Sequence, residues 1–124
     1  MSYGITVQQE LRGLNRELRR SIPQVYEGYR QLHDAALAPG ALDAKTKELI
    51  ALAIAVSKEC DGCIAAHTRG VAQQGATEQE VAETIGVAIL MNGGPGTVYG
   101  ARAFAAFREF HTQHAGGDAQ IGGG

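Results

Sequence analysis

The sequence predicts an all-α protein that forms a single domain of about six helices. Three observations support this prediction. Apolar residues recur at intervals of three and four over most of the chain, which would place them in a stripe along one face of each helix. No segment alternates apolar and polar residues over the length of a strand. Capping residues, prolines and glycines separate one apolar stripe from the next. The 124 residues can bury one core without staples. We place the domain at residues 1–115 and a disordered glycine-rich tail at residues 116–124.

The first two predicted helices lie before residue 40. Thr6 and Gln9 have the spacing of a capping box at the start of the first helix. Ser21 is the expected start of the second helix, with Pro23 in its first turn and a Pro-Gly pair at its end. His33 has no partner visible in the sequence, so we interpret it as structural or exposed, unless this helix covers the cysteines and makes it an outer donor.

The third predicted helix begins after Asp43, its expected N-cap, and contains Glu48. It is rich in alanine and almost uncharged after Glu48, so we expect it to be buried around most of its circumference. A buried carboxylate is costly unless it is paired. We therefore expect His67 or an ordered water beside Glu48.

The fourth helix carries the only two cysteines of the chain, Cys60 and Cys63. The Asp-Gly pair between them favours a helix start, which places both thiols where free N–H groups and the helix dipole stabilise an anion. A thiol reacts as its thiolate, and therefore needs a lowered pKa. His67 lies on the same helix face four residues after Cys63, and Glu48 can orient the imidazole. The pattern predicts a relay from Glu48 through His67 to Cys63. Arg69, which is not part of this relay, could form an ion pair with Glu48 or lie in solvent.

The last two helices follow a second capping box, formed by Thr77 and Glu80. The glycine-rich segment between them lacks the lysine and the preceding strand of a phosphate-binding loop. We interpret it as a tight turn that lets two backbones approach closely. Tyr99 and Arg102 lie off the apolar stripe of the last helix and are expected to face a neighbour.

The composition argues against several classes of function. Eleven Lys and Arg against thirteen Asp and Glu give a net charge of −2, which provides no basic surface for nucleic acid. No run of about 18 apolar residues predicts a membrane span. The N-terminal residues lack the order of a secretory signal, so a cytoplasmic location is expected, where a C-x-x-C pair is more often reactive than structural. Several helices have more than one apolar face, which predicts self-association.

The arrangement of Glu48 twelve positions before the C-x-x-C-x-x-x-H motif resembles the carboxymuconolactone decarboxylase family, in particular its alkylhydroperoxidase D-like branch. The similarity extends over about residues 41–104. The resemblance implies that Glu48, Cys60, Cys63 and His67 form a peroxide-reducing centre. It also implies a homotrimer or a homohexamer of two trimers, with the cysteines near subunit contacts. Some members have an additional histidine just before the second cysteine, where this chain has Gly62.

The predicted function is thiol-dependent reduction of a peroxide in antioxidant defence, without cofactor or metal. In this hypothesis Cys63 takes an oxygen from the peroxide and becomes a sulfenic acid, with which Cys60 condenses to close a disulfide. The two roles could be exchanged, since the first cysteine of a C-x-x-C site is often the exposed one. An external dithiol, such as a lipoyl arm or a thioredoxin-like protein, would reopen the bond.

Three alternatives stay open from the sequence. The first is a zinc-binding module, because Glu48, Cys60, Cys63 and His67 could supply four ligands. The second is a cofactor-free enzyme like the lactone decarboxylases of the family, although those members generally lack the cysteine pair. The third is a redox sensor that forms the disulfide without turnover.

Overall fold

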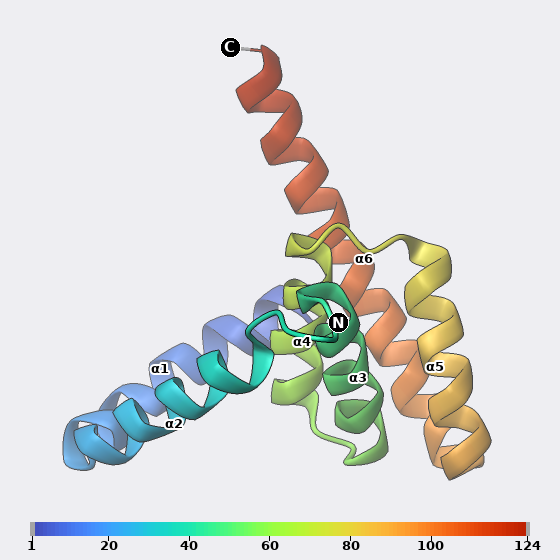
Figure 1. The fold of residues 1–124 in the computed structure, drawn as a ribbon. Helices are drawn as coiled ribbons and strands as arrows, with labels where there is room; N and C mark the ends of the chain where they lie inside the picture. Colours follow the sequence, from blue (N-terminus) through green and yellow to red (C-terminus); the bar gives the residue numbers. More distant parts are fainter. Residues whose placement is uncertain (1, 124) are drawn as a thin grey trace.

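The protein consists of six α-helices, which we describe from a computed structural model that covers residues 2–123 and the side chains of residues 2–113. The helices are α1 (Ile5–Ser21), α2 (Pro23–Leu37), α3 (Ala44–Ser57), α4 (Asp61–Gln73), α5 (Glu78–Asn92) and α6 (Gly94–Gly123) (Figure 1). Residues 2–123 contain no strand, which confirms the all-α fold class. None of the helices described is both long and apolar enough to cross a membrane.

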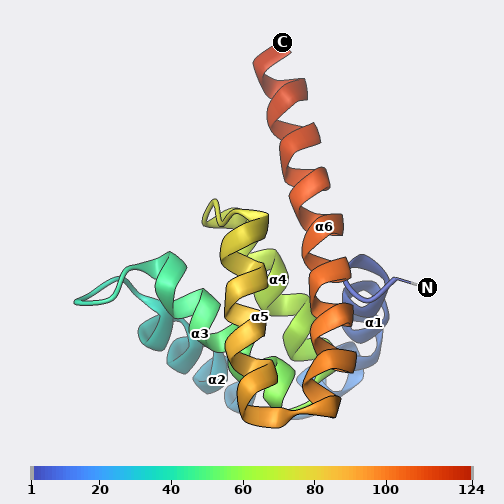
Figure 2. The same ribbon diagram turned by 90° about the vertical axis from the view of Figure 1, so that its right-hand side faces the viewer.

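Helices α3 to α6 form the core. α4 packs between α3 and α6, and α5 packs against the same two helices, as Figure 2 shows from the side. The largest fully buried side chains come from these four helices: Leu52, Val56, Ile64, Thr68, Val71, Val81 and Phe107. The one polar member is satisfied, because the hydroxyl of Thr68 donates to the carbonyl of Ile64 at 2.7 Å.

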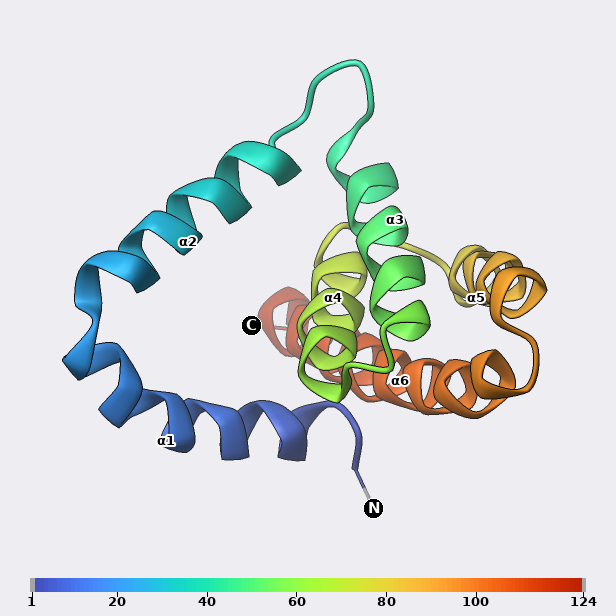
Figure 3. The same cartoon turned by 90° about the horizontal axis from the view of Figure 1, so that it is seen from below.

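Helices α1 and α2 form an arm that projects from this core and meets it only near its two ends (Figure 3). Neither helix contains a buried residue. Large apolar side chains along the arm are exposed in the protomer: Leu14, Leu18, Val25, Tyr29 and Leu32. The arm therefore carries apolar surface that the protomer itself does not cover.

Helix α3 is less buried than its composition predicts. Leu52, Ala55 and Val56 face the core, but Ile50 is 45% exposed and Ile54 is 54% exposed. The expectation of burial around most of its circumference is wrong for the protomer, because none of the elements in the described part of the chain covers the outer face of α3.

Two predicted helix caps are confirmed. The backbone N–H of Thr46 donates to the side chain of Asp43 at 2.7 Å, which caps α3. At the start of α5, the N–H of Glu80 donates to the Thr77 hydroxyl and the Glu80 carboxylate accepts from the N–H of Thr77. Both caps depend on residues three positions apart, so the local sequence determines them.

The other two predicted caps are wrong. The N-cap of α1 is Gly4 rather than Thr6, and the first-turn N–H of Ile5 donates to Glu109 of α6 instead of a neighbouring side chain. Ser21 is the last residue of α1, where its hydroxyl donates to the carbonyl of Glu17, and α2 begins at Pro23 without a side-chain cap. At α1 a distant carboxylate and the Ser2 hydroxyl, which accepts from the N–H of Thr6 at 3.2 Å, replace the capping box that we predicted. At α2 the proline has no N–H that would need a cap.

The turn between α5 and α6 requires glycine, as predicted. Gly93 has a φ of 67°, which side chains rarely adopt. A Cβ on Gly96 would lie 3.0 Å from the Cα of Ile89, so the two helices approach closely at this position. Beyond the turn, α6 extends to Gly123, through most of the segment where the sequence predicts a disordered tail. The side chains from residue 114 onward are outside the described part, and the domain limit at residue 115 stays a prediction.

Candidate active site

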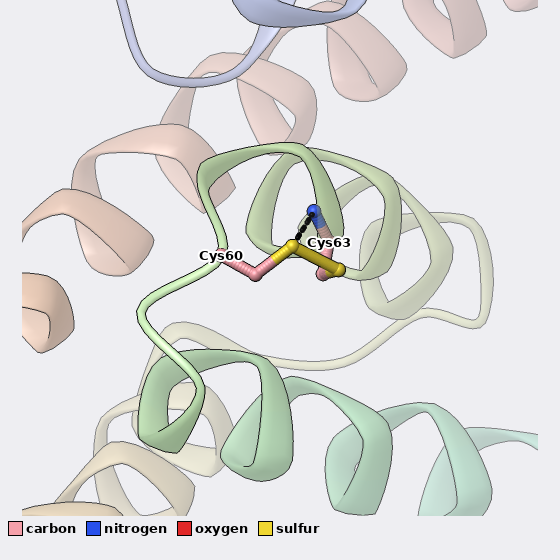
Figure 4. The surroundings of a disulfide bond; sticks show 2 residues. All are labelled: Cys60 and Cys63. Carbon is pink, nitrogen blue, oxygen red and sulfur yellow. Dashed lines mark hydrogen bonds between the residues drawn. A yellow bond between two sulfur atoms is a disulfide. The ribbon is translucent and has the colours of Figure 1, made fainter.

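The two cysteines lie at the start of α4, as predicted. Cys60 is the N-cap of the helix, and its sulfur accepts from the N–H of Cys63 at 3.2 Å (Figure 4). A disulfide joins Cys60 and Cys63, whose Cα atoms are 5.2 Å apart. The chain reaches Cys60 through Glu59, a residue other than glycine with a φ of 54°. This tight reversal places the cysteines at the positive end of the α4 dipole.

The carboxylate and imidazole that were expected to interact do so. Glu48 of α3 and His67 of α4 are joined at 2.8 Å between Oε2 and Nδ1, and their side chains are 13% and 19% exposed. A proton on Nδ1 donates to the carboxylate, which leaves Nε2 of a neutral ring as the basic nitrogen. The pair is therefore suited to accept a proton at Nε2 and to stabilise the resulting charge.

Gly70 provides the space for Glu48. A Cβ at Gly70 would lie 2.5 Å from both Cδ and Oε2 of Glu48 and 2.7 Å from Oε1. The carboxylate therefore lies directly against the backbone of α4, one turn beyond His67. Gly70 is not among the residues predicted from the sequence, although a glycine inside a helix, three residues after a candidate catalytic histidine, is a signal for such close approach.

Cys63 and His67 line the same shallow hollow, of about 240 Å³, with Ala51, Ile54, Ala55 and Lys58. The Cys63 side chain is exposed and Cys60 is half-buried. Among the described residues, the expected hydrogen bond between His67 and Cys63 is not formed, because the Cys63 sulfur is bonded to that of Cys60. The hollow thus brings together an exposed cysteine and an imidazole in apolar surroundings.

His33 reaches this site from α2. Its ring stacks against that of His67, with centroids 6.2 Å apart and an angle of 21° between the ring planes. Asp34 lies beside it, with Oδ1 at 3.3 Å from Nδ1 of His33. The side chain of His33 is 43% exposed, in agreement with the prediction of a structural or exposed residue, and the arm also brings its ring against His67.

Three further residues for which contacts were considered are Tyr99, Arg102 and Arg69. Tyr99 and Arg102 contact each other and residues of their own chain: the Arg102 guanidinium lies 4.7 Å from the ring of Tyr99 and 4.9 Å from that of Tyr3. The same guanidinium pairs with Asp61, which lies between the two cysteines. Arg69 does not reach Glu48, because its exposed side chain lines a hollow beside α1.

The metal alternative has no support in this arrangement. In the part of the chain with described side chains, no three His, Cys, Asp or Glu side chains gather in a way that could hold a metal ion. The four ligands proposed for zinc are instead divided into a disulfide and a carboxylate–imidazole pair.

Comparison with known proteins identifies relatives of similar size. The sequence model of the carboxymuconolactone decarboxylase family matches residues 23–106. An uncharacterised protein of Cupriavidus necator is 39% identical over 90 residues, which are 73% of this chain and 80% of that protein. The fold is similar to that of an apo carboxymuconolactone decarboxylase family protein from Legionella pneumophila, with a TM-score of 0.82 and 42% identity over 86% of this chain and 95% of that one. A Thermotoga maritima protein has a TM-score of 0.76 and 28% identity, covering 90% of this chain and 95% of its own. It is described as a family protein with a possible involvement in antioxidative response.

Proposed function

Because this chain belongs to the carboxymuconolactone decarboxylase family and carries a cysteine pair beside a Glu48–His67 pair, we propose that it is a thiol-dependent peroxide reductase in antioxidant defence. One observation carries the proposal. The exposed Cys63 and the carboxylate-bound His67 line one hollow, and Cys60 is within disulfide distance of Cys63. These are the groups that a peroxidatic thiol, its base and its resolving thiol require.

The reaction starts from the dithiol. His67 takes the proton of the Cys63 thiol at Nε2, and Glu48 stabilises the imidazolium. The thiolate attacks one oxygen of the hydroperoxide, the O–O bond breaks, and the leaving alkoxide receives the proton from His67. Cys63 is then a sulfenic acid, and the Cys60 sulfur displaces its hydroxyl as water, which closes the disulfide.

The exposures of the two cysteine residues support Cys63 as the attacking thiol. Cys63 is exposed and opens to the hollow, whereas Cys60 is half-buried at the N-cap of α4. The hollow is lined mainly by Ala51, Ile54 and Ala55, with Lys58 as its cation. This lining suits an organic hydroperoxide with an apolar chain better than a strongly charged substrate.

The cycle also requires partners, which are part of the proposal. A dithiol reductant, either a lipoyl arm or a thioredoxin-like protein, donates two electrons and two protons to reopen the disulfide. Self-association as a homotrimer or homohexamer would cover the exposed apolar residues of α1 and α2. We propose a cytoplasmic location, where such reductants keep thiols reduced.

The test is intact-mass analysis of the reduced, metal-free protein before and after one equivalent of an organic hydroperoxide. The parent should lose two hydrogens, and Cys60→Ser should accumulate a trappable sulfenic acid on Cys63. Serine is itself a good N-cap, so Cys60→Ser should keep the start of α4 intact. Cys63→Ser is the matched control and should not react. An unchanged parent mass would reject the peroxidase. Disulfide formation without turnover in the presence of dithiols would favour the redox sensor.

A further inference from the structure

The acidic residue inside the C-x-x-C motif is unfavourable for thiol chemistry. Asp61 follows Cys60 directly and is the first residue of α4. Its carboxylate stabilises the helix through the dipole. The same negative charge disfavours a thiolate nearby, since like charges raise the pKa of an acid.

Arg102 of α6 compensates this charge. Its Nη1 lies 3.2 Å from Oδ2 and 3.4 Å from Oδ1 of Asp61, across 41 residues of sequence. The guanidinium also contacts the rings of Tyr3 and Tyr99, at 4.9 and 4.7 Å from their centroids. Two aromatic contacts and an ion pair together restrict a side chain that would otherwise be mobile.

The position of Tyr3 is itself fixed by α6. Glu109 accepts hydrogen bonds from the hydroxyl of Ser2 and from the backbone N–H groups of Gly4 and Ile5. Gly4 lies so close to α6 that a Cβ there would be 2.8 Å from the ring of Phe110. The N-terminal segment, α6 and the start of α4 therefore form one connected cluster around Arg102.

We propose that Arg102 is a positioning residue of the redox centre: it neutralises Asp61 and so keeps the cysteine pair reactive. The redox role of the pair rests on the proposed function, but the electrostatic effect can be measured without peroxide. Removing one charge from this partly exposed site changes the ionisation of a nearby thiol by about half to one pH unit.

Other charged groups also face the thiols, and the test must separate them from Arg102. Lys58 at the end of α3 lines the hollow, Glu59 precedes Cys60, and the Glu48–His67 pair lies on α3 and α4 with His33 of α2 stacked on it. All of them are unchanged in the variants of Arg102 and Asp61, so their contributions cancel. The pair of Asp61 and Arg102 is 41% and 30% exposed, and such pairs add little to stability, so the variants should fold.

The experiment measures the rate of iodoacetamide alkylation of each cysteine against pH, with peptide mapping, in reduced protein. Arg102→Gln should raise the pKa of the more acidic thiol and reduce its alkylation at low pH by about three- to tenfold. Asp61→Asn combined with Arg102→Gln should return the rate to within about twofold of the parent, because no unpaired carboxylate remains. Arg102→Lys should keep most of the parent rate.

Two outcomes would overturn the inference. One is an unchanged thiol pKa in Arg102→Gln; the other is an equal loss in the single and the double variant, which would mean a packing role for Arg102. Circular dichroism melts identify a variant that has lost its fold, and in that case Arg102→Lys against Asp61→Asn provides the comparison.

A parent protein that shows this coupling but does not reduce peroxide would refute the proposed function alone. A parent that turns over without the coupling would refute this inference alone.

Discussion

Substitution of Gly70 by alanine should slow peroxide reduction while leaving the fold in place. The added methyl carbon would lie 2.5 Å from Cδ and Oε2 of Glu48, closer than non-bonded carbon and oxygen atoms approach. The α4 backbone cannot retreat, because Ile64, Thr68 and Val71 on the same helix are fully buried. The Glu48 carboxylate must therefore rotate away, which breaks its 2.8 Å contact with His67.

The expected change in stability is small because two effects oppose each other. Alanine in a helix interior is favoured over glycine by about 1 kcal/mol. Loss of a hydrogen bond to a charged group costs about 1.5–3 kcal/mol. The free energy of unfolding in urea should therefore fall by roughly 0.5–2 kcal/mol. Peroxide reduction should fall by about 10- to 100-fold, since His67 loses the group that orients it.

The assay is the rate of disulfide formation after one equivalent of hydroperoxide, followed by intact mass. Glu48→Gln is the comparison variant, and Gly70→Ala should match its rate. Gly86→Ala is the matched control, because a Cβ at Gly86 of α5 meets nothing within 4 Å. The control should be stabilised by about 1 kcal/mol and keep the parent rate. If Gly70→Ala gains stability as the control does, the methyl group has not displaced Glu48 and the steric argument is wrong. If it loses stability but keeps the parent rate, the coupling of Glu48 to His67 does not contribute to the chemistry.

Three further predictions follow from other contacts. His33→Phe keeps a ring against His67 and should retain the rate within about twofold, whereas His33→Ala should lose about three- to tenfold; equal rates would exclude a role for stacking. Glu59→Gly should raise the free energy of unfolding by about 0.5–1 kcal/mol in urea melts, because glycine accepts the φ of 54° without strain; a decrease would contradict this. Burial raises the pKa of Glu109, but the hydrogen bonds from Ser2, Ile5 and Gly4 outweigh it and hold that pKa below its usual range. This carboxylate therefore adds stability above the unfolded pKa near 4.5 that is lost as the pH falls through the lower folded value. Glu109→Gln should have a smaller loss of stability between pH 5 and pH 3, about 0.5–1 kcal/mol less, and an unchanged loss would contradict the contacts.

The fold was predictable where short-range sequence determines structure. Asp43 and Thr77 cap their helices through residues three positions away, and the apolar stripes of α3 to α6 identify the core. The start of α1 was not predictable, because Glu109, more than a hundred residues later, satisfies its first N–H groups. The exposed outer face of α3 was also missed, since composition alone cannot say whether an apolar face is covered by the same chain.

The candidate site also contains some contacts that could be predicted from the sequence and others that could not. The contact of Glu48 with His67 was predicted from the cost of burying a lone carboxylate beside a helix that carries an imidazole. Gly70 and His33 required the packing of neighbouring helices to be known. The ion pair of Arg102 and Asp61 joins α6 to α4. Arg102 lies off the apolar stripe of its helix, and the spacing of apolar residues does not predict which residue pairs with such a side chain.

The Cys60 sulfur is both a redox atom and the acceptor that closes the first turn of α4. In the disulfide the S–S bond holds this sulfur against the N–H of Cys63, whereas in the proposed dithiol state Cys60 is a protonated thiol and only a weak acceptor. The first turn should therefore open more often after reduction, and the Cys63 amide should exchange its hydrogen faster in the reduced protein. Reduction would then loosen the end of α4 from which the thiols act, so that a single backbone amide reports the oxidation state of the pair.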